Sequence, residues 1–159
     1  MERRIFPRHQ GVFCYEGVAR MNATDLDGGG GNVAQRYTEE AHLPCNFGGI
    51  SLGASGEEVE CTTIDAMGLE DVGFVHCDAQ GAENFIFSKG QALLRRCRPV
   101  VYFEDNAAHG RYLYDTVCRA YPQYETESLF DVKRFCMDEL GYRQVIERFN
   151  GGIDTLLVP

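Results

Sequence analysis

Apolar residues recur along the chain in four short runs that predict β-strands. Residues 11–19 (GVFCYEGVA) predict a short buried strand, and residues 58–67 (EVECTTIDAM) alternate polar and apolar positions as an exposed strand does. The runs at 72–78 (VGFVHCD) and 100–103 (VVYF) are almost continuously apolar, which is typical of parallel strands covered on both faces. We therefore expect His76, within the third run, to lie in or near the core.

Three segments show the spacing of amphipathic helices. They cover residues 84–97, in which Gly90 weakens the pattern, residues 110–120, and residues 129–140, with Gly141 as the C-terminal stop. The first of these connects two of the predicted strands. Such a strand–helix–strand unit predicts a right-handed crossover and a parallel strand pair.

The C-terminal runs YRQVIERF and IDTLLVP flank an Asn-Gly turn, which predicts an antiparallel hairpin. The order of elements predicts a single α/β domain over residues 1–159. In open sheets of this kind, ligands bind outside the carboxyl ends of the strands. Asp78 and residues 104–106 (EDN) lie at those ends, so we expect the chemistry there.

Composition and charge narrow the choice of partners and compartment. The chain of 159 residues is 44% hydrophobic and carries a formal net charge of -9, which argues against nucleic acid or an anionic membrane as the main partner. No apolar run is long enough to span a bilayer, and the N-terminus MERRIFPRHQ lacks the apolar core of a signal peptide. We therefore expect a cytoplasmic protein.

The cysteines and a glycine-rich patch add no chemistry. Seven cysteines are scattered, odd in number and never spaced as C-x-x-C, so we expect buried thiols rather than disulfides or a zinc site. Residues 25–32 (DLDGGGGN) lack the later ligands of a calcium loop and predict a flexible turn.

Three motifs in the centre of the chain carry a family resemblance. They are TIDAM (63–67), DAQGAE (78–83) and RPVVYFE (98–104), preceded by NFGGISL (46–52). This pattern resembles the FkbM family of methyltransferases, which shows T-(I/L)-D-x-(L/M), then D-V-E-G-A-E at a strand end, then R-P-V-(I/V) with an acidic exit. The C-terminal hairpin is also similar to that of the family, so the resemblance covers roughly residues 11–159.

The resemblance implies a class I methyltransferase (Rossmann-like) fold, with a mostly parallel sheet, helices on both faces and a C-terminal antiparallel hairpin. It also implies S-adenosylmethionine as cofactor and O-methylation of a hydroxyl on a glycan or small metabolite. Gln80 departs from the family pattern, because it stands where the family has a glutamate.

The family's glycine-rich first turn and its ribose-binding acid are not found before Gly11. We therefore expect a domain lacking the first strand–helix units, on the order of 60 residues. Two alternatives follow. The chain is a non-catalytic, degenerate binding module, or it is a half-enzyme whose cofactor loop comes from a partner chain. An exposed sheet edge at the missing strands predicts a homodimer through that edge.

The resemblance and the strand ends together assign candidate cofactor and substrate residues. By fold analogy Gly17 and Val18 would lie near the adenine, and Asp78 and Gln80 would contact the cofactor. Glu83, Glu104 and Asn106 are the candidates for binding the acceptor. Glu83 has an alternative role as a capping carboxylate at a helix N-terminus.

Catalysis needs alignment and a group that takes the hydroxyl proton. We expect Asp78 and His109 to serve the reaction, with His109 as the base; the alternative for His109 is an ordinary loop histidine. Asp78, Asp105 and Asn106 resemble the Mg²⁺ site of catechol-type O-methyltransferases, whereas in the alternative EDN only caps its strand.

Overall fold

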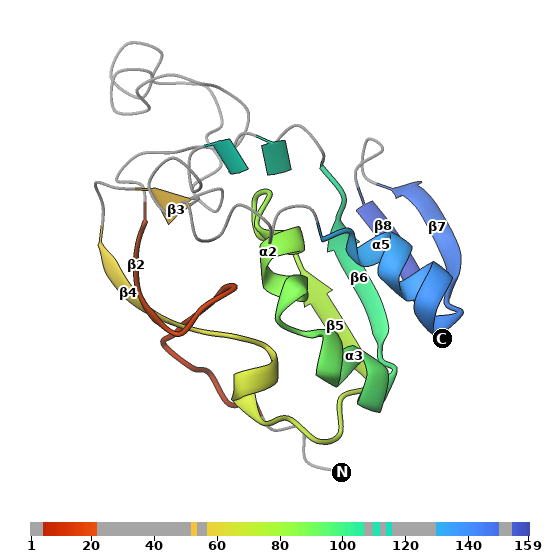
Figure 1. The fold of residues 1–159 in the computed structure, drawn as a ribbon, viewed down its shortest axis with the longest axis horizontal. Coiled ribbons are helices and arrows are strands. Elements are labelled where there is room, and N and C mark those ends of the chain that lie inside the picture. Colours follow the sequence, from red (N-terminus) through yellow and green to blue (C-terminus); the bar gives the residue numbers. More distant parts are fainter. Residues whose placement is uncertain are drawn as a thin grey trace.

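The structure is a computed structural model with two four-stranded sheets that carry short helices (Figure 1). It describes residues 5–21, 52–53, 57–106, 110–111, 114–115, 130–149 and 154–159. Within these ranges, every helix is too short or too polar to cross a lipid bilayer.

The N-terminal sheet has the strand order β1-β4-β2-β3. Its strands are β1 (Gly11–Val12), β2 (Gly17–Met21), β3 (Leu52–Gly53) and β4 (Glu58–Thr62). β1 runs parallel to β4, and β2 runs antiparallel to both β4 and β3.

The prediction of one strand over residues 11–19 is wrong, because the chain bends between β1 and β2. Gly11 and Gly17 both pair with Cys61, so the two strands flank β4 on opposite sides. The Tyr15 hydroxyl donates to the Val18 carbonyl at 2.9 Å and closes the bend, and Gly17 takes a φ of 151°. Glycine permits that backbone conformation at little steric cost.

The predicted strand over residues 58–67 is shorter than expected and ends at Thr62. The chain then forms the 3-10 helix η1 (Asp65–Met67). Asp65 explains this change, because its carboxylate accepts hydrogen bonds from Leu93 N at 2.9 Å and Ala92 N at 3.2 Å. The position that Asp65 needs in order to bind the start of α3 is not one that a continued β4 strand would provide.

The C-terminal sheet has the strand order β5-β6-β8-β7. Its strands are β5 (Phe74–Cys77), β6 (Val100–Glu104), β7 (Arg143–Phe149) and β8 (Asp154–Val158). β5 and β6 are parallel, as their helical connection predicts, and β8 is antiparallel to both β6 and β7. The C-terminal hairpin is confirmed, although its turn lies outside the described residues.

Both sheets are mixed, so the mostly parallel sheet that the family resemblance implies is not what the described residues form. Each sheet contains one parallel strand pair, and the remaining pairs are antiparallel. The protein is nevertheless α/β, because a strand–helix–strand crossover links β5 to β6. Antiparallel partners on the other side of β6 follow from the local hairpin, which needs no crossover.

The helix predicted over residues 84–97 is split into α2 (Glu83–Ser88) and α3 (Gln91–Cys97). Gly90 sits at the break, where an added Cβ would lie 2.9 Å from Ile64 Cδ1. The close approach to Ile64 therefore requires glycine at this position.

The helix predicted over residues 129–140 is confirmed in part. α5 (Val132–Arg134) starts after Asp131, whose carboxylate accepts from Arg134 N at 2.9 Å, and continues as the π-helix η4 (Phe135–Glu139). Gly141 follows with a φ of 69°, as expected for a helix stop. Of the helix predicted at 110–120, residues 110–111 and 114–115 are helical and the remainder lies outside the described residues.

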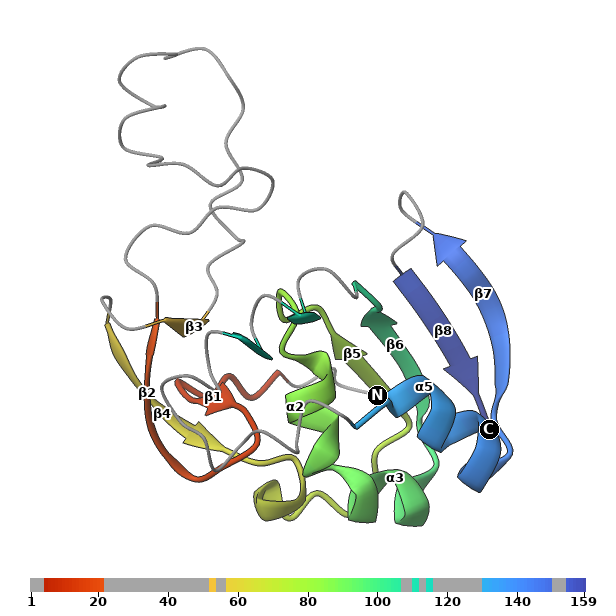
Figure 2. The same ribbon diagram turned by 45° about the horizontal axis from the view of Figure 1, so that its top comes forward.

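The helices α2, α3 and α5 all lie on one side of the C-terminal sheet (Figures 1 and 2). Side chains that face them, such as Val101, Phe103 and Leu157, are at most 2% exposed. On the other side Phe74 is 57% exposed and His76 is also exposed. The predictions of helices on both faces and of a core His76 are therefore wrong for the described residues.

Buried thiols and aromatic rings fill the core under the helices. Phe85, Phe87, Leu93 and Leu94 from α2 and α3 are at most 1% exposed. Four of the described cysteines are buried free thiols, as predicted, namely Cys14, Cys61, Cys77 and Cys136, whereas the Cys97 thiol is half-buried.

Candidate functional site

The carboxyl ends of the two parallel strands bring acidic residues together. Cys77 of β5 pairs with Phe103 of β6, so the next residue on each strand, Asp78 and Glu104, are neighbours. This follows from parallel pairing alone, because parallel strands end at the same edge of a sheet. The strand-end location that the sequence predicted for the site is the location of this acidic pair.

A tight turn after Asp78 adds a third carboxylate. Ala82 N donates to Ala79 O at 3.1 Å, and the two central residues Gln80 and Gly81 have φ values of 54° and 91°. Positive φ at both central positions is the conformation of a type I′ turn, which Gly adopts freely and Gln does not. The turn delivers Glu83 at the start of α2, where its Oε1 accepts from Ala79 N at 2.6 Å. The capping role of Glu83 is thus present.

Asp78, Glu83 and Glu104 form a carboxylate cluster. Each offers an oxygen, and these atoms all lie within 4.8 Å of one another. Glu83 is 4% exposed and Glu104 is 6% exposed, while Asp78 is exposed. Two amides flank the cluster: Gln80 Nε2 donates to Asp78 Oδ1 at 3.4 Å, and Asn106 Nδ2 donates to Glu104 Oε1 at 3.1 Å.

Burial and like charge make Glu83 the unusual titrating group of the cluster. Burial raises the pKa of Glu83 to about 7, the charges of Glu104 and Asp78 act in the same direction, and the bond from Ala79 N opposes them. A carboxylate with this pKa exchanges a proton at neutral pH. The cluster can therefore accept a proton from a bound hydroxyl or hold a cation.

The neighbouring thiol has no nucleophilic role. Burial raises the pKa of Cys77 well above its usual range, and the charges of Glu83 and Asp78 raise it further. The thiolate is the reactive form of cysteine, so Cys77 stays protonated and inert.

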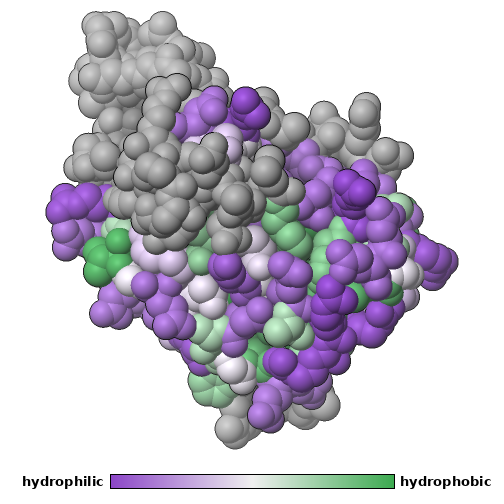
Figure 3. All heavy atoms as spheres, in the orientation of Figure 1, coloured by the Kyte–Doolittle hydropathy of each residue, from purple (hydrophilic) through white to green (hydrophobic). Residues whose placement is uncertain are grey.

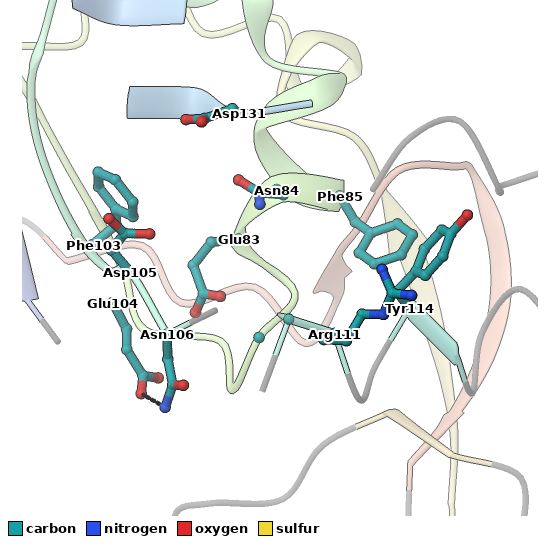
Figure 4. Close-up of a pocket in the computed structure, with 12 residues that line it drawn as sticks. Glu83, Asn84, Phe85, Phe103, Glu104, Asp105, Asn106, Arg111, Tyr114 and Asp131 are labelled. Carbon is teal, nitrogen blue, oxygen red and sulfur yellow. Dashed lines mark hydrogen bonds between the residues drawn. The ribbon is translucent and has the colours of Figure 1, made fainter. Parts of the chain in front are cut away.

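A cavity of about 290 Å³ opens beside the cluster (Figure 4). It lies between the start of α2, the end of β6 and the helical residues Gly110, Arg111 and Tyr114. The residues that line it are Gly81, Glu83, Asn84, Phe85, Phe103, Glu104, Asp105, Asn106, Gly110, Arg111, Tyr114 and Asp131.

The cavity has two chemically different walls. In Figure 4, the carboxylate of Glu83 points toward Glu104 and Asn106, while Arg111 and Tyr114 lie on the other side. The Arg111 guanidinium lies 5.6 Å from the Tyr114 ring centre and 3.7 Å from the Asp115 carboxylate. One wall therefore offers acceptors for hydroxyl groups, and the other offers an aromatic surface with a cationic edge.

The carboxylate cluster fits a hard divalent cation such as Mg²⁺, which prefers oxygen ligands. Asp78, Glu83 and Glu104 would hold it, and the ion would lower the pKa of an acceptor hydroxyl. The set predicted from sequence was Asp78, Asp105 and Asn106. Of these, Asp105 and Asn106 line the cavity, and burial raises the pKa of Asp105.

The structure groups most, but not all, of the residues that the sequence singled out. Asp78, Gln80, Glu83, Glu104 and Asn106 lie in or beside the cluster. The predicted adenine contacts are elsewhere: Gly17 and Val18 belong to β2, pair with β4 and do not line the cavity. His109 lies outside the described residues, so its role as base stays a prediction.

Sequence reasoning missed several residues that line the cavity, among them Arg111, Tyr114 and Asp131. Arg111 and Tyr114 stand three positions apart in the predicted helix, a spacing that puts them on one face and was the available signal. Asp131 caps α5 and also lines the cavity. Its capping position was readable from the sequence, but its place beside β6 depends on tertiary packing.

Comparison with known proteins gives one match. The family model of the methyltransferase FkbM domain matches residues 13–143, which contain the carboxylate cluster and the residues lining the cavity. No curated protein and no solved structure matches the chain.

Proposed function

This chain belongs to the FkbM methyltransferase family, and on that premise we propose that it transfers a methyl group from S-adenosylmethionine to a hydroxyl of a glycan or small metabolite. The observation that carries the proposal is the carboxylate cluster beside the cavity, inside the matched region. Two carboxylates at the strand ends, Asp78 and Glu104, and one at the start of α2, Glu83, supply hydrogen-bond acceptors for hydroxyl groups and a proton acceptor for the reaction.

In this proposal the acceptor lies in the cavity with its hydroxyl toward Glu83 and Glu104. The Tyr114 ring, on the aromatic wall, would hold the ring of a sugar or phenol. Asp78, the exposed member of the cluster, would lie toward the methyl donor, and His109 remains the candidate base. A methyl transfer then needs the donor and the oxygen aligned, and a group that takes the proton.

The test begins with calorimetry of the whole chain with S-adenosylmethionine and S-adenosylhomocysteine, followed by a screen of sugars and phenols for S-adenosylhomocysteine release. Asp78→Asn should lower kcat/KM by about a hundredfold with any acceptor found. Asp71→Asn, an exposed aspartate in the segment before β5, is the matched control and should leave it unchanged. Cofactor binding without release of product from any acceptor counts against O-methylation of these classes.

A second candidate is a half-enzyme completed by another polypeptide, and the position of β5 favours it. β5 is the terminal strand of the C-terminal sheet, so its outer edge has no strand partner among the described residues. The cavity volume is also at the low end of the range for ligand sites, which suits an acceptor but not an acceptor and a donor together. Acceptor binding with no S-adenosylmethionine binding at millimolar ligand would select this candidate, and cofactor binding by the isolated chain would reject it.

A further inference from the structure

The uncovered face of the C-terminal sheet carries an apolar row that crosses all four strands. The register pairs Phe74 with Val100, Tyr102 with Leu156, and Leu156 with Ile146, so these side chains share one face. Phe74 is 57% exposed and Ile146 is 36% exposed. We call this set, Phe74, Val100, Tyr102, Leu156 and Ile146, the bare face.

The bare face contrasts with the opposite side of the molecule. The helix side, toward the viewer in Figures 1 and 3, presents mainly hydrophilic side chains among smaller apolar ones. Parallel strand pairs such as β5–β6 are normally covered on both faces, whereas antiparallel pairs can leave one face open to water. An apolar face open to water is therefore a candidate interaction surface.

Charges at the two ends of the bare face differ in sign. At the carboxyl end of β6, Asp154 accepts from the Tyr102 hydroxyl at 2.7 Å, which places its carboxylate on this face beside the stacked rings of Tyr102 and His76. At the other end, Arg143 pairs with Val158, which faces the same side as Leu156. Arg143 is exposed. The face thus has an acidic end, an apolar middle and a basic end.

We propose that a second copy of this chain covers the bare face, with the two sheets packed face to face and their strands antiparallel. A two-fold axis perpendicular to the strands reverses the second sheet, so Arg143 of each copy lies over the end of the other sheet that carries Asp154. The alternative axis, parallel to the strands, superimposes like-charged ends. Charge complementarity therefore selects the antiparallel arrangement, which joins apolar middle to apolar middle.

The size of the face sets the strength of this dimer. Four strands about 4.8 Å apart, with about five residues each at 3.3 Å, give a face of roughly 19 by 17 Å. That is smaller than the ~800 Å² per partner of a standard stable interface. The dimer is accordingly weak, with a Kd in the micromolar range. The contact is through the sheet face and not through the edge that the sequence suggested.

Sedimentation velocity of the full chain, from low to high micromolar protein at physiological ionic strength, tests the proposal. The wild type should show a reversible monomer–dimer equilibrium. Phe74→Asp should raise the dimer Kd by about tenfold or more, because it places a charge in the apolar middle. Val18→Asp is the matched control, since Val18 is 56% exposed but lies on β2 of the other sheet, and it should leave Kd unchanged.

A charge exchange tests the orientation. Arg143→Glu should weaken the dimer, and the double variant Arg143→Glu with Asp154→Arg should recover part of that loss. A wild type that stays monomeric over the whole range overturns the proposal. So does equal weakening by Phe74→Asp and Val18→Asp, or a dimer that neither Phe74→Asp nor Arg143→Glu weakens. A stable complex of the monomer with a different purified protein on this face also overturns it.

Discussion

Two motif carboxylates, Asp65 and Glu83, each lie at the start of a helix, and their surroundings are opposite. Both oxygens of Asp65 accept backbone N–H groups from α3, and it lies at the surface. Glu83 accepts the Ala79 N–H, is buried, and lies beside two further carboxylates. The first arrangement stabilises the fold, because the helix start is capped. The second opposes folding at neutral pH, which is expected of a site kept for chemistry.

Removing the charge of Glu83 should have the largest effect on stability. The pKa of Glu83 is about 7 in the folded chain, against an ordinary value of 4.5, so the folded chain binds the proton more tightly. The free energy of unfolding therefore falls as pH rises from about 4.5 to about 7, and stays low above that. Glu83→Gln removes this fall and should stabilise the protein above pH 7 by up to about 3 kcal/mol, and by almost nothing near pH 4.5.

Urea unfolding of Glu83→Gln and wild type at both ends of that pH window measures the effect. Glu70→Gln, a change at an exposed glutamate before β5, is the control and should show no pH-dependent gain. A Glu83→Gln variant that is destabilised equally at both pH values contradicts our view of this residue.

Removing the Asp65 carboxylate should have the opposite effect and destabilise the protein. Asp65→Ala leaves Ala92 N and Leu93 N without their carboxylate acceptor, and should lower the free energy of unfolding by about 1–2 kcal/mol. The urea midpoint should fall with the m-value unchanged, and amide exchange at residues 92 and 93 should accelerate. Asp71→Ala should change the free energy of unfolding by less than about 0.5 kcal/mol.

A divalent cation should reduce the destabilisation that charged Glu83 causes and that Asp65 does not. Mg²⁺ held by Asp78, Glu83 and Glu104 offsets their repulsion, so it should stabilise the protein above pH 7 by about 1 kcal/mol at a concentration several times its Kd. The thermal midpoint with and without Mg²⁺ measures this, and Glu104→Gln should abolish the shift. An unchanged wild-type midpoint, with Ca²⁺ as well as Mg²⁺, removes the metal from the site.

The smallest effect concerns the turn that delivers Glu83. Gln80 has a φ of 54°, which is strained for a residue with a side chain. Gln80→Gly should stabilise the protein by about 0.5–1 kcal/mol in chemical denaturation. Gln80→Ala keeps the strain and loses the amide bond to Asp78, so it should not stabilise. A gain from both variants would mean that the backbone strain at Gln80 is not the cause.

Elements that depend on residues close together in the sequence could be predicted, whereas features that depend on tertiary packing could not. β6 and the C-terminal hairpin could be predicted because a continuous apolar run and the Asn-Gly pair are signals that act over a few residues. The split between α2 and α3 could not, because it depends on the contact of Gly90 with Ile64. The exposure of His76 depends on which elements cover a sheet face, and its own strand carries no such signal.

The same limit applies to the site. The acidic strand ends were predictable, because parallel pairing of β5 and β6 places Asp78 and Glu104 side by side at the same edge of the sheet. The members of the cluster were not predictable from the sequence. The third carboxylate is that of Glu83 rather than Asp105, because the turn at Gln80 and Gly81 places Glu83 beside the other two. Arg111 and Tyr114 reach the cavity through helix packing, which no local pattern specifies.

The approach of Gly90 to Ile64 has an evolutionary consequence. A Cβ at position 90 would meet Ile64 Cδ1 at 2.9 Å and Cβ at 3.1 Å, so a side chain at position 90 is disfavoured while residue 64 is isoleucine. An alanine at 90 becomes acceptable only in a lineage that has first shortened residue 64. In related sequences, a side chain at position 90 should therefore occur together with a residue smaller than isoleucine at position 64. A change at position 90 alone should mark a domain in which α2 and α3 are no longer separate helices.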